Sequence, residues 1–332
     1  MSFNIENRRY TGSKAKLSDW IFDLIGKECE GDIFLDIFAG TGVISANASK
    51  YFKKIIVNDF LYSNNIIYQA FFLDAKWDEE KVLNLIKKYN ELNKEKLIEN
   101  YFSKNFGNKY FSKTDSKIIG FIREDIETQN LNKKEKAILL ASLIYSMDKI
   151  ANTVGHYDAY RKKIKINDRF KLDIIRPLNM EVEIFQEDAN LLAKKIIADI
   201  VYIDPPYNSR QYSRFYHVLE NITNWKKPKL YGTALKPEPT EMSDYCRVTA
   251  PKKFEELIND LNCKYIVVSY NNTYDSKSNS SKNKIELDEI KNILEKKGVT
   301  KVFKKNHKHF NAGNTSFNNH QEFIFITRVN HG

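Results

Sequence analysis

Short apolar segments of strand length constrain the fold of this 332-residue chain more than any other feature. They lie at Ile33–Phe38, Ile55–Val57, Ile200–Ile203, Tyr265–Ser269 and Glu322–Ile326. Ile55–Val57 and Ile200–Ile203 are continuous apolar runs, and Ile33–Phe38 is interrupted by Asp36 alone; such runs are typical of strands that are buried on both faces. Each of the first four precedes a stretch that can form a helix. This alternation predicts an α/β fold with a mainly parallel, doubly wound sheet.

A long segment without strand-like patterns interrupts this alternation at residues 76–179. Apolar residues recur there at helical spacing along Asp78–Tyr89, Ser116–Thr128 and Lys133–Asn152. We therefore expect a mainly helical inserted subdomain at 76–179, within a domain formed by residues 1–75 and 180–332.

Four later segments depart from the alternation of strands and helices. Val299–Phe303 and Glu322–Ile326 flank a polar stretch and predict an antiparallel pair that closes the sheet. Lys226–Pro251 contains four prolines, which predicts a long surface loop. Asn271–Lys284 is rich in Ser, Asn and Lys, and we expect it to be mobile.

A glycine-containing turn follows the first predicted strand. Asp36 is followed by Gly40 and Gly42, which allow the backbone to approach a ligand closely and to turn into a helix. Asp59 follows the next strand, and a carboxylate at about this distance along the chain suits the ribose hydroxyls of a nucleoside cofactor. Without further evidence, the same residues are equally compatible with a tight turn and a helix cap.

A rigid turn directly follows the strand Ile200–Ile203. Its sequence is Asp204-Pro205-Pro206-Tyr207, and consecutive prolines fix φ and donate no hydrogen bond, so carbonyl groups point outward. The Asp204 carboxylate and the Pro205 carbonyl can then accept both hydrogens of an exocyclic amino group, while Tyr207 stacks on the base. The tetrapeptide alone can be only a turn. Its position at the end of a strand, after a glycine turn, favours a catalytic site.

Together these segments resemble the paired motifs of amino-group DNA methyltransferases that use S-adenosyl-L-methionine. The motifs are Phe34–Gly42 and Asp204–Tyr207, and Arg9–Lys14 is similar to the N-terminal cofactor motif of these enzymes. Their order, with a long insertion between them, is that of the Dam-type alpha class of N6-adenine methyltransferases. The stretch Asp204–Glu220 is similar to adenine methyltransferases of restriction-modification systems. The resemblance covers residues 7–60 and 182–330.

The resemblance implies a fold and a set of site residues. The fold is a Rossmann-like seven-stranded methyltransferase sheet, with the insertion at 76–179 as the target recognition subdomain. The implied cofactor contacts are Tyr10 and Lys14, Asp36, Gly40 and Gly42 around the methionine portion, Asp59 at the ribose, Asp188 near the adenine, and Asp204 between the cofactor and the target amine. The implied catalytic segment is Asp204, Pro205, Pro206 and Tyr207.

Positive charge points to a polyanionic partner. Lys and Arg number 53 against 43 Asp and Glu, a net charge of +10, although an AT-rich genome, which inflates the Lys content, would give the same balance. We expect double-stranded DNA to contact Arg210, Tyr212, Arg214, Arg161, Lys301 and Lys305, with Tyr157, Lys162, Lys163 and the segment from Lys304 to Thr315 as further candidates. Solvated surface charge is the alternative for each of them.

Other functional classes stay open at this stage. An N4-cytosine methyltransferase would use the same physics, although Asp rather than Ser before the two prolines speaks against it. Methylation of adenine N6 in RNA and a catalytically silent DNA-binding regulator are further alternatives. The three cysteines and six histidines form no metal-binding pattern, and no Pro-Cys pair supplies the thiolate that C5-cytosine methylation needs.

The sequence also suggests a cellular setting. The polar N-terminus and the lack of any apolar run of about 20 residues predict a cytoplasmic protein without a membrane partner. We expect the enzyme to act as a monomer, and a restriction endonuclease for the same site is a possible partner.

Overall fold

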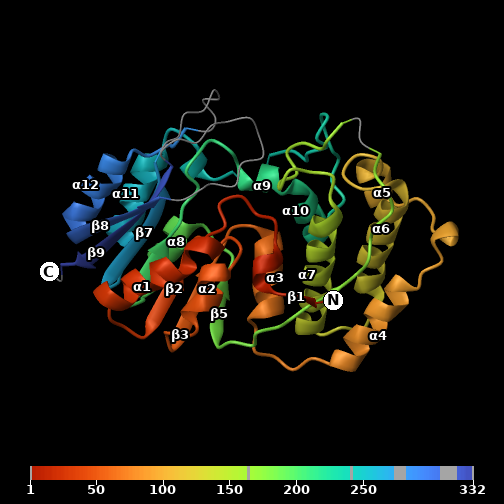
Figure 1. Ribbon diagram of the computed structural model, residues 1–332, viewed down its shortest axis with the longest axis horizontal. Helices are drawn as coiled ribbons and strands as arrows, with labels where there is room; N and C mark the ends of the chain where they lie inside the picture. The colour runs from red at the N-terminus through yellow and green to blue at the C-terminus, as the bar shows by residue number, and fades with distance from the viewer. Residues whose placement is uncertain (1, 163–164, 240–241, 273–281, 307–319, 331–332) are drawn as a thin grey trace. The chain divides into compact units, whose positions relative to one another are not determined.

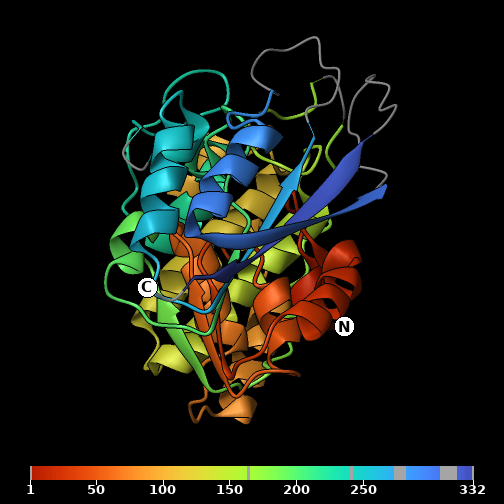
Figure 2. The ribbon, with the colours of Figure 1, turned by 90° about the vertical axis from the view of Figure 1, so that its left-hand side faces the viewer.

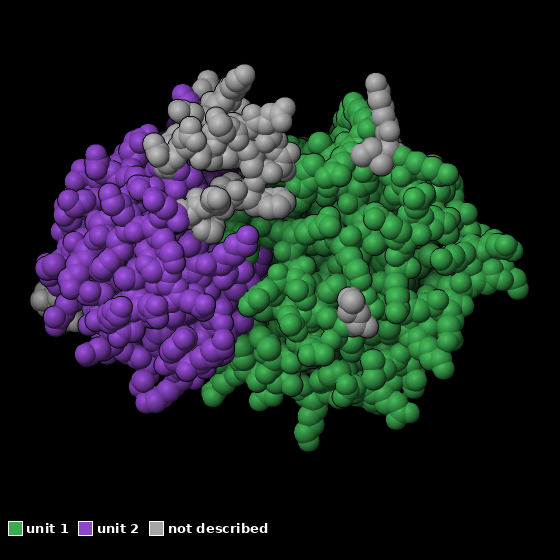
Figure 3. All heavy atoms as spheres, viewed as in Figure 1, with its two compact units in different colours: residues 1–13, 61–181, 212–240 green, residues 14–60, 182–211, 241–332 purple. Residues whose placement is uncertain are grey.

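The computed structural model describes all residues except 1, 163–164, 240–241, 273–281, 307–319 and 331–332. The chain forms two compact units (Figure 3). We call residues 1–13, 61–181 and 212–240 the helical unit, and residues 14–60, 182–211 and 241–332 the sheet unit. The chain therefore passes between the units five times. The helical unit contains the expected insertion at 76–179 together with segments that precede and follow it.

The sheet unit is built on seven strands (Figure 1). They are β2 (Ile33–Asp36), β3 (Lys54–Asn58), β5 (Val182–Phe185), β6 (Ile200–Ile203), β7 (Tyr265–Asn271), β8 (Gly298–Asn306) and β9 (Gln321–Val329). Their order across the sheet is β5-β3-β2-β6-β7-β9-β8, and only β9 runs antiparallel to its neighbours. The predicted α/β fold with a seven-stranded, mostly parallel sheet and a closing antiparallel pair is confirmed.

Helices cover both faces of this sheet. They are α1 (Ser18–Glu28), α2 (Val43–Ala48), α8 (Ala189–Ala193), α11 (Ala250–Asp260) and α12 (Leu287–Lys297), with short 3-10 turns at Ala15–Leu17 and Asp244–Cys246. Figure 2 shows α11 and α12 on one face and α1 on the other. Because the central strands β3 and β6 are covered on both sides, most of their residues are buried and apolar in succession rather than in alternation.

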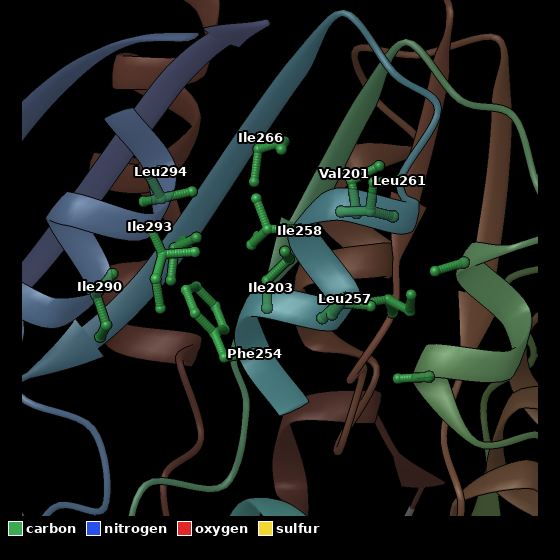
Figure 4. Packing of buried hydrophobic residues seen from close by; sticks show 14 of the residues in the cluster. Val201, Ile203, Phe254, Leu257, Ile258, Leu261, Ile266, Ile290, Ile293 and Leu294 are labelled. Atoms are coloured by element: carbon green, nitrogen blue, oxygen red, sulfur yellow. The ribbon is translucent and has the colours of Figure 1, made fainter. Parts of the chain in front are cut away.

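The face toward α8, α11 and α12 is an apolar core (Figure 4). Alternate strand residues point into it, including Val201 and Ile203 of β6 and Ile266 of β7. Phe254 and Leu257 of α11 meet them and are fully buried. Burying a side chain of this size contributes about 1.5–3 kcal/mol to folding.

The helical unit is organised around one largely buried helix. Its helices are α3 (Tyr62–Phe71), α4 (Glu79–Asn90), α5 (Tyr101–Phe106), α6 (Lys113–Thr128), α7 (Lys133–Ile150), α9 (Tyr212–Phe215) and α10 (His217–Asn224), with 3-10 turns at Ile5–Asn7 and Lys94–Lys96. Two short strands, β1 (Ser2–Phe3) and β4 (Ile174–Ile175), pair in parallel.

Helix α7 begins at a capping box formed by Asn132 and Glu135. It packs against α3, α4 and α6, and nearly all of its residues are buried (Figure 1). A helix that is buried all round acts as the core of a helical assembly. The predicted helices of the insertion are present as α4, α6 and α7.

Three further expectations concern loops and membranes. The predicted loop Lys226–Pro251 is largely irregular but ends early, because Pro251 lies in the first turn of α11, where proline needs no amide hydrogen bond. Most of the predicted mobile stretch Asn271–Lys284 lies outside the described residues. Within the described part of the chain, no helix combines the length and apolar character that a bilayer crossing requires.

Candidate active site

The sheet changes direction of winding between β2 and β6. From β2 the chain continues to β3 on one side, whereas from β6 it continues to β7 on the other. Ligands of open α/β sheets bind outside the carboxyl ends of the strands at such a switch point. The two strands are parallel neighbours, with Asp36 beside Tyr202. The fold therefore places the turn after Asp36 and the Asp204–Tyr207 turn at the same edge.

The glycine turn after β2 has the backbone conformation that the sequence predicts. Gly40 and Gly42 have φ values of 54° and 77°, and Gly42 begins α2. A carboxylate oxygen of Asp59 accepts a hydrogen bond of 2.9 Å from the Gly40 amide. The side-chain amide of Asn58 donates to the carbonyls of Ile37 and Glu187, at 3.0 and 3.1 Å. These bonds fasten the loops that follow β2, β3 and β5 to one another.

Asp36 is a buried carboxyl group with an available acceptor. The Ser45 hydroxyl donates to Asp36 Oδ2 at 2.7 Å, whereas Oδ1 accepts no hydrogen bond from any residue that the structure describes. Burial raises the pKa of Asp36 to about 7, against the lowering effect of the Ser45 hydrogen bond. Asp36 therefore titrates near neutral pH and can accept a hydrogen bond from a ligand.

Asp204 forms an ion pair with Lys14 directly after β6. Its Oδ1 lies 3.1 Å from Lys14 Nζ, and its side chain is 20% exposed. Burial raises the pKa of Asp204 to about 6, and the Lys14 ammonium opposes this rise. Although burial lowers the pKa of Lys14, Asp204 and Glu322 raise it well above its usual value. Lys14 therefore stays charged.

Tyr207 is buried more deeply than the predicted stacking role suggests. Its side chain is 5% exposed, and its ring lies edge-on to Tyr270 with the centroids 6.3 Å apart. Its carbonyl accepts a hydrogen bond of 2.8 Å from the Lys284 amide. These contacts hold the end of the turn rigidly against the apolar core. Stacking of Tyr207 on a target base stays a prediction.

Asp188 caps a helix. It precedes α8, and its Oδ1 accepts hydrogen bonds from the amides of Asn190 and Leu191, at 3.0 and 3.1 Å. The carboxylate lies after β5, at the carboxyl edge of the sheet that also carries Asp59. Contact between Asp188 and a cofactor adenine stays a prediction.

The basic candidates of the sheet unit already have intramolecular contacts. Lys301 pairs with Glu28 at 2.6 Å, and the Lys305 ammonium lies 5.5 Å from the centre of the Trp20 ring. The Arg210 carbonyl accepts a hydrogen bond from the Cys246 thiol. The candidate segment at 307–315 lies outside the described residues, as does Lys163. DNA contacts of Lys301, Lys305 and Arg210 stay predictions.

Tyr10 and Tyr212 belong to an aromatic stack in the helical unit. The Tyr10 ring packs against the rings of Tyr212 and Tyr216, at centroid distances of 5.5 and 4.6 Å, and those two rings are themselves 6.2 Å apart. The Arg8 guanidinium lies 4.9 Å from the centre of the Tyr10 ring. Tyr10 and Lys14, which the sequence predicts to contact one cofactor, thus belong to different units. The cofactor contact of Tyr10 stays a prediction.

The other candidates of the helical unit differ in exposure. The Tyr157 side chain is buried and donates to Asp148 at 2.7 Å, so its hydroxyl has an internal structural role. The Arg214 guanidinium donates to the Pro237 carbonyl. Arg161 is exposed, and its backbone pairs with Asn152. Contact of Arg161 or Arg214 with DNA stays a prediction.

Two charged residues that the sequence analysis did not select are buried. Arg8 contacts Asp148 and Asn64 in the helical unit, and Glu322 contacts Lys14 in the sheet unit. A pattern in β9 could have revealed Glu322. It shares the strand alternation of the buried residues Ile324 and Ile326, so a charged side chain occupies an inward position.

Comparison with known proteins identifies relatives. The sequence matches the family described as D12 class N6 adenine-specific DNA methyltransferase over residues 10–273, which contain the motifs Phe34–Gly42 and Asp204–Tyr207 and all of the N-terminal motif except Arg9. It is 30% identical to the type II methyltransferase M.NlaIII of Neisseria lactamica, over 94% of this chain and 95% of that relative. It is 31% identical to the type II methyltransferase M.CviAII of Paramecium bursaria Chlorella virus 1, over 96% and 98%.

Some relatives are longer than this chain. The modification methylase StsI of Streptococcus sanguinis is 36% identical over 80% of this chain, which spans 44% of that relative's length. The matches confirm the resemblance that the motifs indicated.

Proposed function

Because the chain belongs to the D12 class of N6 adenine-specific DNA methyltransferases, we propose that it performs this reaction at the carboxyl ends of β2 and β6, with Asp204 as the catalytic residue. It methylates the exocyclic N6 of adenine within a specific DNA sequence. The observation that carries the proposal is the ion-paired Asp204 carboxylate beside the glycine turn, at the switch point of the sheet.

S-adenosyl-L-methionine is the proposed methyl donor, and the residues at this edge fit it. Asp36 Oδ1 is a buried acceptor that lacks a hydrogen-bond donor among the described residues, which suits an ammonium group such as that of methionine. Gly40 and Gly42 present backbone without side chains, and Asp59 is the proposed ribose ligand. Tyr10, Lys14 and Asp188 are further proposed contacts. When bound, this donor supplies a methyl group that a positively charged sulfur has already activated.

The proposed work of Asp204 is to orient the target amine. The lone pair of adenine N6 is delocalised into the ring, which makes the nitrogen a poor nucleophile. Hydrogen bonds to Asp204 and to the Pro205 carbonyl favour a pyramidal nitrogen, whose lone pair is free to attack. A pKa of about 6 keeps Asp204 ionised at neutral pH, so it can accept this bond. After transfer, the carboxylate takes the surplus proton from nitrogen. Positioning and electrostatics supply most of the rate enhancement.

The adenine must leave the duplex before it reaches Asp204. Extrusion of a base costs a few kcal/mol. Stacking on an aromatic side chain returns about 1–3 kcal/mol, and we assign this role to Tyr207. Pro206 and Pro205 would hold the turn rigid during the exchange of bases.

DNA binding is assigned to basic and aromatic residues of both units. The proposed contacts are Arg210, Tyr212, Arg214, Arg161, Lys301 and Lys305. Residues 76–179 would recognise the target sequence. Since the relatives named above include type II and modification methyltransferases, a restriction endonuclease of the same specificity is a proposed partner, and the enzyme would act as a monomer.

Mass spectrometry of methylated nucleosides tests the proposed function. Unmethylated duplex DNA is incubated with the protein and S-adenosyl-L-methionine and then digested, with Asp204→Ala as the matched control. We expect N6-methyladenine from the native protein and none from the variant. N4-methylcytosine, or product on RNA alone, would overturn the substrate assignment. Equal product from the variant would overturn the role of Asp204.

A further inference from the structure

Buried polar side chains form a row across one face of the sheet. They come from four neighbouring strands and lie on the face opposite the apolar core: Asp36, Tyr202, Ser269, Asn271 and Glu322. The register places Asp36 beside Tyr202 and Asn271 beside Glu322. Each of these residues as a whole is at most 3% exposed. Polar groups are costly to bury at this depth, so a row of them indicates a role beyond folding.

We propose that Glu322 is a positioning residue for Asp204, acting through the Lys14 ammonium that the two carboxylates share. The inference deepens the proposed function and rests on the catalytic role of Asp204.

Lys14 bridges the two carboxylates. Its Nζ lies 3.1 Å from Asp204 Oδ1 and 3.7 Å from Glu322 Oε2. The side chains of Lys14 and Glu322 are only 5% and 4% exposed, so neither charge has water as its principal partner. An ammonium group has three donors and can serve both acceptors at once. The position of Glu322 therefore sets where the Lys14 ammonium lies, and the ammonium in turn sets the orientation of the Asp204 carboxylate.

Glu322 is itself held in place. His320 Nε2 lies 3.3 Å from Glu322 Oε1, and the His320 side chain is buried. Residue 322 lies near the start of β9 and is held from both sides, since β9 pairs with β7 on one side and β8 on the other. A rigid strand positions a functional group more accurately than a loop does. Glu322 therefore gives the Lys14 side chain a second contact that a rigid strand holds in place.

The shared ammonium also sets the charge of the site. Two carboxylates and one ammonium leave one net negative charge, which favours a cationic ligand. Lys14 at Oδ1 leaves Asp204 Oδ2 to accept a hydrogen bond from the target amine. Other groups that act electrostatically on this cluster are Tyr202, Tyr207 and Asp36, and Lys305 lies opposite Glu322 in the register.

The two neighbours of Asp204 act on its proton affinity in opposite directions. Burial raises its pKa, Lys14 lowers it and Glu322 raises it. Glu322→Gln should therefore lower the pKa of Asp204, whereas Lys14→Met should raise it. A loss of packing alone would not produce shifts of opposite sign.

The test is a carbon-13 NMR titration of the Asp204 carboxyl in the protein without ligands, whose signal is identified by its absence from Asp204→Asn. We expect a fall of about half to one pH unit in Glu322→Gln and a rise of about one unit or more in Lys14→Met. The matched control is the exposed Lys54–Glu183 pair at 2.6 Å in the same unit. Glu183→Gln and Lys54→Met should leave the Asp204 titration unchanged. An unshifted Asp204 in Glu322→Gln would overturn the proposal.

Single-turnover methyl transfer gives the second readout. Glu322→Gln should lower the rate about tenfold and move its acid limb to lower pH, while the dissociation constant of S-adenosyl-L-methionine stays within about twofold. If Glu322→Gln does not fold, Glu322→Asp provides the test. It retains the charge but withdraws it from Lys14, so the rate should fall, and an unchanged rate would refute the positioning role. Full activity of Asp204→Asn would instead refute the proposed function, while the titration would still report on Glu322.

Discussion

Adjacent residues of one strand show how differently the two faces of the sheet are used. On β6, Ile203 points into the apolar core with α11 and α12, whereas Tyr202 belongs to the polar row on the opposite face. Asp204 continues that polar side and meets Lys14. The same alternation occurs on β9, where Phe325 joins the core and Glu322 contacts Lys14.

Both faces contain buried apolar side chains, since Phe34, Ile200 and Val267 lie on the second face, but the row of buried polar side chains near the proposed site also lies on that second face. Burial of the apolar side chains stabilises the folded protein. The polar face holds buried charges, whose loss of hydration costs free energy that their pairing only partly returns. The stabilisation from the apolar core therefore offsets the cost of burying the charged side chains of the proposed site.

Asp204→Asn should have the largest effect, and it tests whether the polar row serves catalysis and not stability. The substitution keeps the size of the side chain but removes its charge, so methyl transfer should fall on the order of a thousandfold. Single-turnover rates with saturating DNA and cofactor measure this effect. The free energy of unfolding should change little or rise, because a buried charge is lost. A comparable loss of stability and activity would show that the polar face is part of the structural core.

The reciprocal substitution is Phe254→Ala on the apolar face. It leaves a cavity in the core and should cost about 3–5 kcal/mol of the free energy of unfolding. Denaturant titration measures this loss, and Val299→Ala, at an exposed position of β8, is the matched control with little effect. The single-turnover rate of the folded fraction should stay near the native value. A large fall in that rate would mean that the two faces are coupled.

Asp59→Ala tests the proposed cofactor contact at the carboxyl edge of the sheet. It removes the acceptor of the Gly40 amide and the proposed ribose ligand, so S-adenosyl-L-methionine should bind about ten- to a hundredfold more weakly. Calorimetry measures the affinity. Asp32→Ala, an exposed carboxylate at the amino end of β2, is the control. Equal affinities for both variants would remove Asp59 from the cofactor site.

The smallest expected effect concerns Lys301 and Lys305. If both contact phosphates, changing both to Glu should reduce the slope of log affinity for DNA against log salt by about two. Changing Lys53 and Lys54, which lie at the amino end of β3, to Glu should leave the slope unaltered. If the slope is unaltered when Lys301 and Lys305 are changed, these lysines do not contact phosphates and serve only their contacts with Glu28 and Trp20.

Much of the sheet could be predicted because its signals are local. Ile200–Ile203 is a continuous apolar run, and the turn at Asp204 follows it directly in the chain. The glycine turn is equally local, since the positive φ values of Gly40 and Gly42 are what its glycines allow.

The contacts between distant segments could not be predicted in this way. Glu322 meets Lys14 only because β9 inserts between β7 and β8, and no spacing in the sequence reports that register. Tyr10 was associated with Lys14 by its position in a motif, yet its ring packs on Tyr212 and Tyr216 in the helical unit. Sequence spacing indicates which residues are close along the chain, whereas stacking and charge pairing depend on the folded backbone.

An ionised Asp204 is proposed to orient the target amine, and the pH dependence of single-turnover methyl transfer is the measurement that tests this role. With S-adenosyl-L-methionine saturating, so that the titration of Asp36 near pH 7 affects cofactor binding and not the rate, the rate should fall as the pH drops through about 6, because the active form of Asp204 is the carboxylate. A rate that stays constant down to pH values well below 6 would contradict the account.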